Sequence, residues 1–502
     1  MRTHRLLALL LWGLAASAAA ELPDIHPAGI RGTLILGGAK SIKPALNTFM
    51  KAAGGEDAKI LVITTDDPTA TCETLRVMRQ LAPDVTVQAS RETDPATAIQ
   101  GMTGLWLTGS NLQGLRDLAQ DTNLREALDT FLKSGQVIGA TGMPTQTLGT
   151  FHDDANPGLK QLPDAVIGHP YPGSVIKRFP HIVAYELEED AALLIHGRLL
   201  RSIGAGRIDI RRNLRNGEPP VTLTLSPEHP LADLTALRRT ARDSTLQRPT
   251  KAPKPNVRNG TLILIGGGGM PAGIVDRFVK LAGGQDARIV VLPTAVPDPI
   301  RKPYRIDETF RKAGAGKVTV LPGRTLKKVE SAEYLAAFKE ATGLWFGGGR
   351  QWRFVDAYLG TRAHPLMHDV LRRGGVVMGS SAGASIQAEY LARGNPLGNL
   401  KVMAPGYERG LNVLHGTAVD QHFSQRNRFE DLKKLTQAHP RLLGIGIDES
   451  TALIVRKKIG AVAGKGKVFF YDNRTGSNPK QIAIPNGGRF NLTARKVVDV
   501  SK

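Results

Sequence analysis

Cysteine and long apolar runs are both scarce in this chain. Cys72 is the only cysteine among 502 residues, so an intrachain disulfide is excluded and stability must come from packing. The apolar run Leu6–Leu14 falls short of the roughly 20 residues that a membrane-spanning helix needs. No later segment is long enough to span a bilayer. These absences exclude a disulfide-based small domain and argue against an integral membrane protein.

The first twenty residues have the pattern of a secretory signal peptide. Arg2 and Arg5 precede the short apolar run, and Ala18–Ala20 supplies small residues for cleavage before Glu21. We therefore expect residues 1–20 to be removed and the mature protein to be periplasmic or secreted. An acyl-lipid anchor directly after the cleavage site is excluded because no cysteine stands there.

Acidic residues are outnumbered by basic ones. The chain has 45 Asp and Glu against 66 Lys and Arg, which gives a formal net charge of +21. The basic residues are spread along the chain, and an exported protein seldom has nucleic acid as its intended partner. We expect no nucleic-acid partner; a basic surface of this kind suits acidic polymers or the cell envelope.

The chain contains an internal repeat of about half its length. The repeated segments are Gly32–Gly37 with Gly260–Gly266, Ala53–Ile63 with Ala282–Leu292, and Thr103–Gly109 with Thr342–Gly348. This repeat predicts two related domains at residues 21–245 and 259–502. A basic linker that contains prolines joins them at residues 246–258.

Each copy alternates short β-branched runs with longer amphipathic stretches. This alternation predicts an α/β fold, in which each domain is a mostly parallel sheet with helices on both faces. Functional residues of such sheets lie at the carboxyl ends of the strands.

The segment Gly379–Gly383 follows a β-branched run and precedes a helix-forming stretch. Its G-x-S-x-G pattern is typical of a nucleophile elbow, where a serine on a sharp strand-to-helix turn projects its hydroxyl from the sheet. Ser381 is the candidate nucleophile. Alignment of the two copies places Thr141 opposite Ser381 and Met143 opposite Gly383. A β-branched and a bulky residue at these places predict a non-catalytic first copy.

A serine nucleophile needs a base, and the base needs an orienting group. His422 is the best candidate for the base, because it follows a strand-like run and is surrounded by polar residues. The acid is Glu449 or its neighbour Asp448, a pair enclosed by apolar sequence. Glu449 is our first choice, but the pattern alone cannot separate the two.

Two other motifs receive a structural interpretation. Residues 266–272 contain a G-x-G-x-x-A pattern, which is compatible with a dinucleotide site but is read here as a loop beside the active site. His364 and His368 have the spacing of a helical metal pair, yet Pro365 stands where H-E-x-x-H needs its glutamate. We therefore expect a surface helix start there and no metal site.

Three segments together resemble the cyanophycinase and aspartyl dipeptidase family of serine peptidases. They are Gly379–Ala384, Asp420–Phe423 with Arg426 and Arg428, and Gly446–Glu449 with Thr451–Leu453. They follow the family's order of serine, histidine and glutamate within residues 258 to 460. The resemblance implies a fold like that of class I glutamine amidotransferases, no cofactor, and Ser381, His422 and Glu449 as nucleophile, base and orienting group.

The resemblance also implies the surroundings of the triad. Backbone N–H groups of Ala382 and Gly348 would form the oxyanion hole. The substrate-binding positions would be Gln351, Asp420, Gln421, Arg426 and Arg428. Two residues depart from the family: Arg350 stands where an acidic residue is common, and Asp431 stands where cyanophycinases commonly have a further arginine. Both departures bear on specificity more than on catalysis.

The predicted function is that of an exported serine exopeptidase. It would hydrolyse cyanophycin, multi-L-arginyl-poly-L-aspartate, or its fragments to β-Asp-Arg dipeptides through an acyl-enzyme. The alternatives are an α-aspartyl dipeptidase acting on small Asp-X peptides and an inactive envelope or polymer-binding protein. The first copy would be a scaffold or substrate-docking domain. A pseudo-dimer of the two copies and a further homodimer both stay open.

Overall fold

A computed structural model describes most of the chain. The described residues are 25–66, 73–81, 85–89, 95–151, 156–168, 173–214, 219–246, 254–300, 302, 304–475 and 479–498. The predicted signal peptide, Cys72 and most of the predicted linker lie outside them. The strand β13 begins at Val257, inside the predicted linker, because Val257 pairs with Lys457 of the neighbouring strand.

The first half is built on an eight-stranded and a four-stranded sheet. The larger sheet has the order β12 (Leu231–Asp233), β9 (Leu199–Ser202), β8 (Ala192–His196), β1 (Thr33–Gly37), β5 (Val137–Thr141), β4 (Gly104–Thr108), β2 (Ile60–Thr64) and β3 (Val85–Ala89). The smaller sheet has the order β11 (Val221–Leu225), β10 (Ile208–Arg212), β7 (Val183–Leu187) and β6 (Ala165–Gly168). Strands β1 to β5 of the larger sheet run parallel, and β8, β9 and β12 extend it antiparallel.

The second half repeats this plan with a nine-stranded and a five-stranded sheet. The larger sheet has the order β15 (Lys317–Val320), β14 (Arg288–Leu292), β16 (Gly343–Phe346), β17 (Val376–Ser380), β13 (Val257–Ile265), β21 (Thr451–Lys457), β22 (Ile459–Gly464), β25 (Arg489–Asn491) and β26 (Lys496–Val498). The smaller has the order β18 (Ala388–Tyr390), β19 (Leu414–Gln421), β20 (Leu443–Ile447), β23 (Val468–Asp472) and β24 (Lys480–Ile484). Read from opposite ends, the orders of the two halves coincide: β8, β1, β5, β4, β2 and β3 correspond to β21, β13, β17, β16, β14 and β15.

Helices cover these sheets. The first half contains α1 (Ile42–Ala53), α2 (Glu73–Leu81), α3 (Pro95–Ala98), α4 (Leu112–Gln120), α5 (Thr122–Lys133), α6 (Pro144–Thr147), α7 (Gly173–Arg178) and α8 (Leu234–Asp243). The second half contains α9 (Ile274–Ala282), α10 (Ile306–Lys312), α11 (Leu326–Val329), α12 (Ala332–Glu340), α13 (Trp352–Tyr358), α14 (Ala363–Arg372), α15 (Ala382–Ser385) and α16 (Phe429–Ala438). Several helices begin where a side chain caps the free N–H groups of the first turn, as Ser331 does for α12 and Asp233 for α8.

The core of the second half has two parts, one on each face of its larger sheet. Leu262 and Leu264 of β13 pack with α12, α13 and α14 and with the smaller sheet. Ile263 and Ile265, which alternate with them, pack with α9 and α10 on the other face. This alternation is what a strand covered on both faces requires.

The predicted α/β fold is confirmed, with two additions. The parallel arrangement holds for five consecutive strands on one side of each larger sheet, whereas strands such as β21 and β22 extend the other side antiparallel. The smaller sheets were not predicted. The apolar pattern of a strand does not reveal which of two sheets that strand belongs to. In the described part of the chain, no helix combines the length and apolar character that crossing a bilayer requires.

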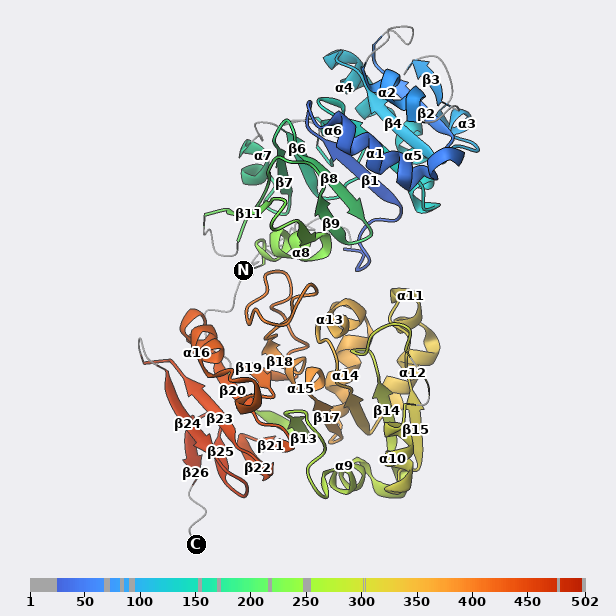
Figure 1. The fold of residues 1–502 in the computed structure, drawn as a ribbon. Coiled ribbons are helices and arrows are strands. Elements are labelled where there is room, and N and C mark those ends of the chain that lie inside the picture. Colours follow the sequence, from blue (N-terminus) through green and yellow to red (C-terminus); the bar gives the residue numbers. More distant parts are fainter. Residues whose placement is uncertain are drawn as a thin grey trace, which may run out of the picture.

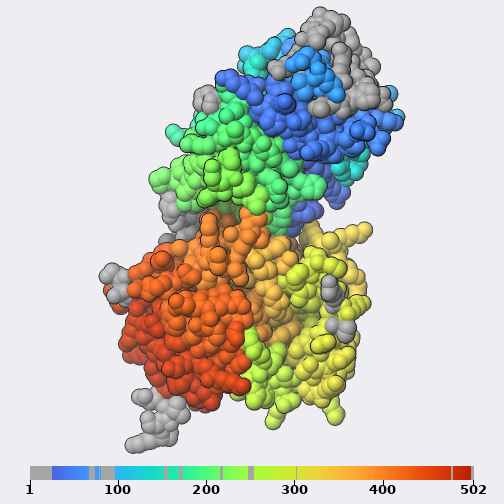
Figure 2. Space-filling model, in the orientation of Figure 1, coloured from blue at the N-terminus to red at the C-terminus, as the bar shows by residue number. Residues whose placement is uncertain are grey.

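The two halves meet along a narrow waist. Figure 1 shows α8 and β9 of the first half above α13 and the loop that follows β18 in the second. The space-filling view shows the same arrangement as two lobes, with the green part of the first half lying on the orange part of the second (Figure 2).

Candidate active site

Ser381 lies on the turn between β17 and α15, at the carboxyl end of the larger sheet. Its backbone has φ 54° and ψ −117°, a conformation that side chains with a Cβ seldom adopt. A Cβ at position 379 would lie 2.2 Å from the carbonyl oxygen of Gly383, and one at position 383 would lie 2.0 Å from that of Phe346. Both glycines of the motif are therefore needed for the turn to form.

Three predicted residues form one hydrogen-bonded chain. Ser381 Oγ lies 2.9 Å from His422 Nε2, and His422 Nδ1 lies 2.5 Å from Glu449 Oε1. Because the carboxylate can only accept, Nδ1 carries the proton and Nε2 accepts from the serine hydroxyl. This is the geometry in which a histidine can take a proton from a serine.

The pKa of His422 favours the neutral ring. Burial lowers this pKa from the ordinary histidine value, and the positive charge of Arg426 lowers it further, while the hydrogen bond to Glu449 opposes both effects. At neutral pH His422 is therefore unprotonated at Nε2 and can act as a base.

Asp448 and Glu449 have different partners. Asp448 accepts the backbone N–H groups of Ser424 at 3.0 Å and Lys467 at 2.9 Å. Its carboxylate thereby holds two loops together, whereas the carboxylate bonded to His422 is that of Glu449. The geometry separates the two acids that the sequence pattern could not, and it places Glu449 on the histidine.

A single stretch of backbone connects the three segments that carry these residues. The carbonyls of Ile265, Gly266 and Gly267 accept the N–H groups of Ser381 at 2.9 Å, His422 at 2.8 Å and Ser450 at 2.7 Å, respectively. Three consecutive carbonyls at the end of β13 thus fix the backbone on which the serine, the histidine and the glutamate stand.

The glycine-rich loop after β13 packs directly on the triad. A Cβ on Gly267 would lie 2.3 Å from His422 Cε1, and a Cβ on Gly268 would lie 2.4 Å from Glu449 Oε2. The glycines therefore allow a close approach to these side chains. Of the two interpretations of this motif, the loop beside the triad agrees with its position.

Two residues with free backbone N–H groups lie next to the serine. Gly348 follows β16, and a Cβ built on it would lie 3.5 Å from Ser381 Cβ. Ala382 is the first residue of α15. Neither N–H donates a hydrogen bond to another of the described residues, so both are available for an oxyanion.

A cavity of about 320 Å³ opens beside Ser381. It is lined by Gly349, Arg350, Gln351, Ser381, Arg393, Asn399, Gln421, Arg426 and Arg428. Four of the five predicted substrate-binding residues are in this set. Asp420 is absent from it.

Asp420 lies behind the cavity wall and is fully buried. Its carboxylate accepts hydrogen bonds from Arg393 at 3.0 and 3.1 Å and from Arg428 at 2.8 Å. In this geometry Asp420 orients two arginines instead of facing the substrate, which corrects its predicted placement. Burial of a carboxylate of this kind is tolerated because it is paired.

Sequence reasoning missed Arg393 and Asn399. Arg393 is 3% exposed and also donates to Asp431 at 2.6 Å. Asp431, which departs from the family pattern, is therefore the partner of an arginine that the pattern did not reveal. No local signal marks Arg393, because its carboxylate partners lie 27 and 38 residues further along the chain.

The first half corrects one predicted alignment. The N–H of Gly142 donates to the carbonyl of Gly37 at 2.9 Å, as the N–H of Ser381 donates to Ile265. Gly142, with φ 67°, thus occupies the place of Ser381. Thr141 is one residue earlier, at the end of β5.

The error came from Gly139, which the alignment matched with Gly379. A Cβ on Gly139 would lie 2.4 Å from the ring of Trp106, so this glycine makes room for the indole within the sheet. It has no part in a turn. The first half therefore lacks a hydroxyl at the nucleophile position.

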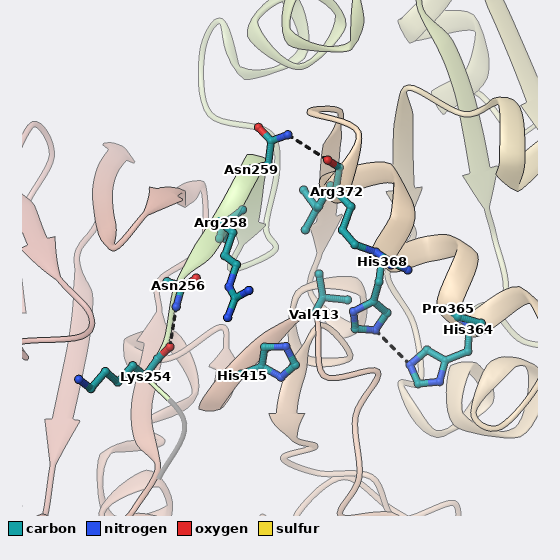
Figure 3. A pocket seen from close by; sticks show the side chains of 12 residues that line it. Lys254, Asn256, Arg258, Asn259, His364, Pro365, His368, Arg372, Val413 and His415 are labelled. Atoms are coloured by element: carbon teal, nitrogen blue, oxygen red, sulfur yellow. Dashed lines mark hydrogen bonds between the residues drawn. The ribbon is translucent and has the colours of Figure 1, made fainter. Parts of the chain in front are cut away.

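His364 and His368 lie far from the triad, at the amino end of β13. Figure 3 shows them with His415 beside a larger cavity of about 1090 Å³. Their Nε2 atoms lie 2.9 and 2.8 Å from the carbonyl of Leu411, and burial lowers the pKa of His368 to about 4. Both rings thus pack against backbone. The smaller cavity, by contrast, is lined by Ser381 of the hydrogen-bonded chain.

Comparison with known proteins finds relatives among the peptidases. The sequence model described as "Peptidase family S51" matches residues 262–461. A cyanophycinase of Geminocystis herdmanii is 33% identical over 207 residues, which cover 40% of this chain and 75% of that protein. A cyanophycinase of Synechococcus elongatus is 34% identical over 207 residues, covering 40% and 63%. A crystal structure of a peptidase from an acI-B1 Actinobacterium aligns with 47% of this chain and 98% of its own, at 21% identity and a TM-score of 0.34.

The protein is a serine-type peptidase with an α/β fold. More narrowly, the chain belongs to peptidase family S51.

Proposed function

We propose that the second half hydrolyses cyanophycin or its fragments to β-Asp-Arg dipeptides. The observation that carries this proposal is the chain from Ser381 Oγ through His422 to Glu449, at 2.9 and 2.5 Å, beside a cavity with four arginines. In this proposal Ser381 is the nucleophile, His422 the base and Glu449 the group that orients it.

The chemical steps follow from the positions of these groups. As Ser381 Oγ attacks the scissile carbonyl, His422 Nε2 accepts its proton, and Glu449 stabilises the resulting imidazolium. The N–H groups of Gly348 and Ala382 would bind the oxyanion, which contributes about 3 kcal/mol per donor in comparable enzymes. His422 then donates the proton to the leaving amine, and water hydrolyses the acyl-enzyme by the reverse sequence.

The arginines suit a substrate with carboxylates. Among the described residues, neither Arg350 nor Arg426 forms an ion pair, although both line the cavity. Arginine binds a carboxylate through two parallel hydrogen bonds, and cyanophycin units present carboxylates next to each aspartyl linkage. The two cyanophycinases similar to this chain support the same substrate class.

The first half is proposed to be a second copy of the peptidase domain that has lost its catalytic residues. The coincident strand orders of the two halves support a duplication. We also propose export of the protein after cleavage before Glu21. Mass spectrometry of the mature N-terminus would test it, and an intact Met1 would contradict it.

The direct test uses purified protein and insoluble cyanophycin. Release of β-Asp-Arg, detected by mass spectrometry and lost in Ser381→Ala, is the expected result. Hydrolysis of small Asp-X dipeptides with the polymer left intact would transfer the assignment to an α-aspartyl dipeptidase. If Ser381→Ala hydrolyses either substrate at the wild-type rate, Ser381 has no part in the reaction.

A further inference from the structure

The face of the second half around α13 is covered by the first half. Arg198 of the first half, at the turn between β8 and β9, binds Asp233 of its own half at 2.6 and 2.9 Å. The same guanidinium reaches the second half, where it donates to Asp356 at 2.6 Å and to the hydroxyl of Tyr407. It also lies 4.8 Å above the ring of Trp352.

The charges at this contact are paired from both sides. Asp356 forms a second ion pair with Arg239 of α8, at 2.6 Å, and it accepts the hydroxyl of Tyr407 at 2.8 Å. The side chain of Asp356 is 11% exposed and that of Arg198 is 20% exposed. Loss of one partner from such a cluster would leave a charge that is neither paired nor well solvated, which is costly in free energy. The cluster therefore favours the arrangement in which all its members are paired.

The backbones of the two halves also approach closely. A Cβ on Gly406 would lie 2.2 Å from the carbonyl oxygen of Ala236 in α8. Ala236 in turn packs against the hydrophobic core of the second half. The contact is therefore fitted in shape as well as in charge.

The covered face carries two walls of the Ser381 cavity. The segment Gly349–Gln351 lines the cavity and leads directly into α13, which bears Trp352 and Asp356. The segment 391–408 contributes Arg393 and Asn399 to the cavity and contains Tyr407.

The two walls are tied to each other. Gln351 Nε2 donates to the carbonyl of Ala392 at 2.7 Å. Within the second wall, the N–H of Leu391 donates to Glu408 at 2.9 Å. Arg198 thus contacts α13, which continues the first wall, and Tyr407 of the second, and it does not line the cavity.

We propose that the first half serves as an internal positioning partner, whose Arg198 holds α13 and residues 391–408 so that Arg350, Gln351 and Arg393 face the substrate. This deepens the proposed function and rests on it. Arg198 is a positioning residue, since it acts through the walls and does not line the cavity. In this proposal the first half, which has lost its own catalytic residues, influences substrate binding in the second half through this contact.

The test replaces Arg198 by glutamine in the full chain. With a soluble β-Asp-Arg oligomer, KM should rise about tenfold while kcat changes less than about threefold, because the walls bind substrate and the triad stands elsewhere. Labelling of Ser381 by a small fluorophosphonate should change less than about twofold. Arg211→Gln, which removes an ion pair with Glu186 at 2.9 Å inside the first half, is the matched control and should leave KM unchanged.

Hydrogen exchange gives a readout that needs no substrate. In Arg198→Gln, exchange of amides in α13 and in residues 391–408 should accelerate, while exchange in β19 and β20 stays as in wild type. Arg198→Lys should restore part of the protection, because lysine pairs with one carboxylate but cannot bridge two as a planar fork does. Unchanged exchange in both walls would overturn the positioning role, whatever the activity.

The two proposals can fail separately. If wild type hydrolyses none of the substrates but Arg198→Gln loosens both walls, the substrate assignment fails and the positioning role stands. If wild type is active and Arg198→Gln has wild-type KM, the positioning role fails and the peptidase assignment stands. Asp356→Asn combined with Arg198→Gln should raise KM no further than either change alone; additive effects would contradict a shared cluster.

Discussion

The turn after β5 in the first half and the turn after β17 in the second stand at corresponding places in the two larger sheets, yet they carry different residues. Gly142 has φ 67° and Ser381 has φ 54°, so the two backbones take a similar course. One residue offers a hydroxyl and the other none. The turn therefore does not depend on the serine, because a positive φ is kept where the hydroxyl is absent.

The loops after β1 and β13 differ in the same sense. Ala39 of the first half corresponds in register to Gly267 of the second half. In the second half, a Cβ at position 267 would collide with His422. Lys40 stands in the position of Gly268 and forms an ion pair with Glu189 at 2.5 Å. The glutamate is kept in both halves, but in the first it pairs with a lysine. At these positions the halves differ by single side chains that are present in one and absent in the other.

The largest effect is expected when the second turn is made like the first. In Ser381→Gly, kcat should fall by about 10⁵-fold or more, as in other serine peptidases that lose the nucleophile. The free energy of unfolding should rise by up to about 1 kcal/mol, because glycine relieves the strained backbone. Steady-state kinetics and urea unfolding measure the two quantities. Gly142→Ser is the control and should create no activity in a chain that carries Ser381→Gly.

The next effect separates the two adjacent acids. Glu449→Gln should lower kcat by about 10³- to 10⁴-fold, because the amide no longer stabilises the imidazolium. Asp448→Asn should leave kcat within about tenfold of wild type but lower the free energy of unfolding by about 1–3 kcal/mol, since it weakens two bonds to backbone N–H groups. The reverse pattern in kinetics and unfolding would assign the orienting role to Asp448.

A smaller effect is expected when the second loop receives the first loop's alanine. Gly267→Ala should lower kcat by about 10²-fold, because the new Cβ displaces the ring of His422 from its position beside Ser381. The matched change Ala39→Gly should leave activity unaltered. A kcat within twofold of wild type for Gly267→Ala would show that the histidine has room to move without loss.

The smallest effect concerns pH. Burial and the charge of Arg426 lower the pKa of His422. The base therefore stays neutral at pH values below the ordinary histidine pKa of about 6.5, and kcat/KM stays high there. Arg426→Gln removes this charge and should raise the pKa of His422. The acidic limb of the plot of kcat/KM against pH should then move to higher pH by a few tenths of a unit. Arg288 pairs with the exposed Glu340. As a control, Arg288→Gln should leave the acidic limb in place. A shift toward lower pH in Arg426→Gln would contradict the sign of this interaction.

Much of the fold and the turn that carries Ser381 could be predicted because the relevant signals are local. The apolar runs marked strands, and the glycines around Ser381 marked a turn whose close contacts require them. Arg393 could not be predicted, since its meaning depends on Asp420 and Asp431, which only the folded chain brings near. Gly142 was misplaced for a related reason: Gly139 imitates a turn glycine in sequence but serves to accommodate Trp106, a contact between neighbouring strands.

The three carbonyls of Ile265, Gly266 and Gly267 have a consequence for evolution. They hold the serine, histidine and glutamate segments by main-chain atoms, and main-chain atoms are the same whatever residue the gene encodes. Side chains at the three positions can therefore be exchanged, lost or regained while the segments that present them keep their backbone contacts. A fold with this property can explore new chemistries by single substitutions, and a duplicated copy can become silent while remaining folded.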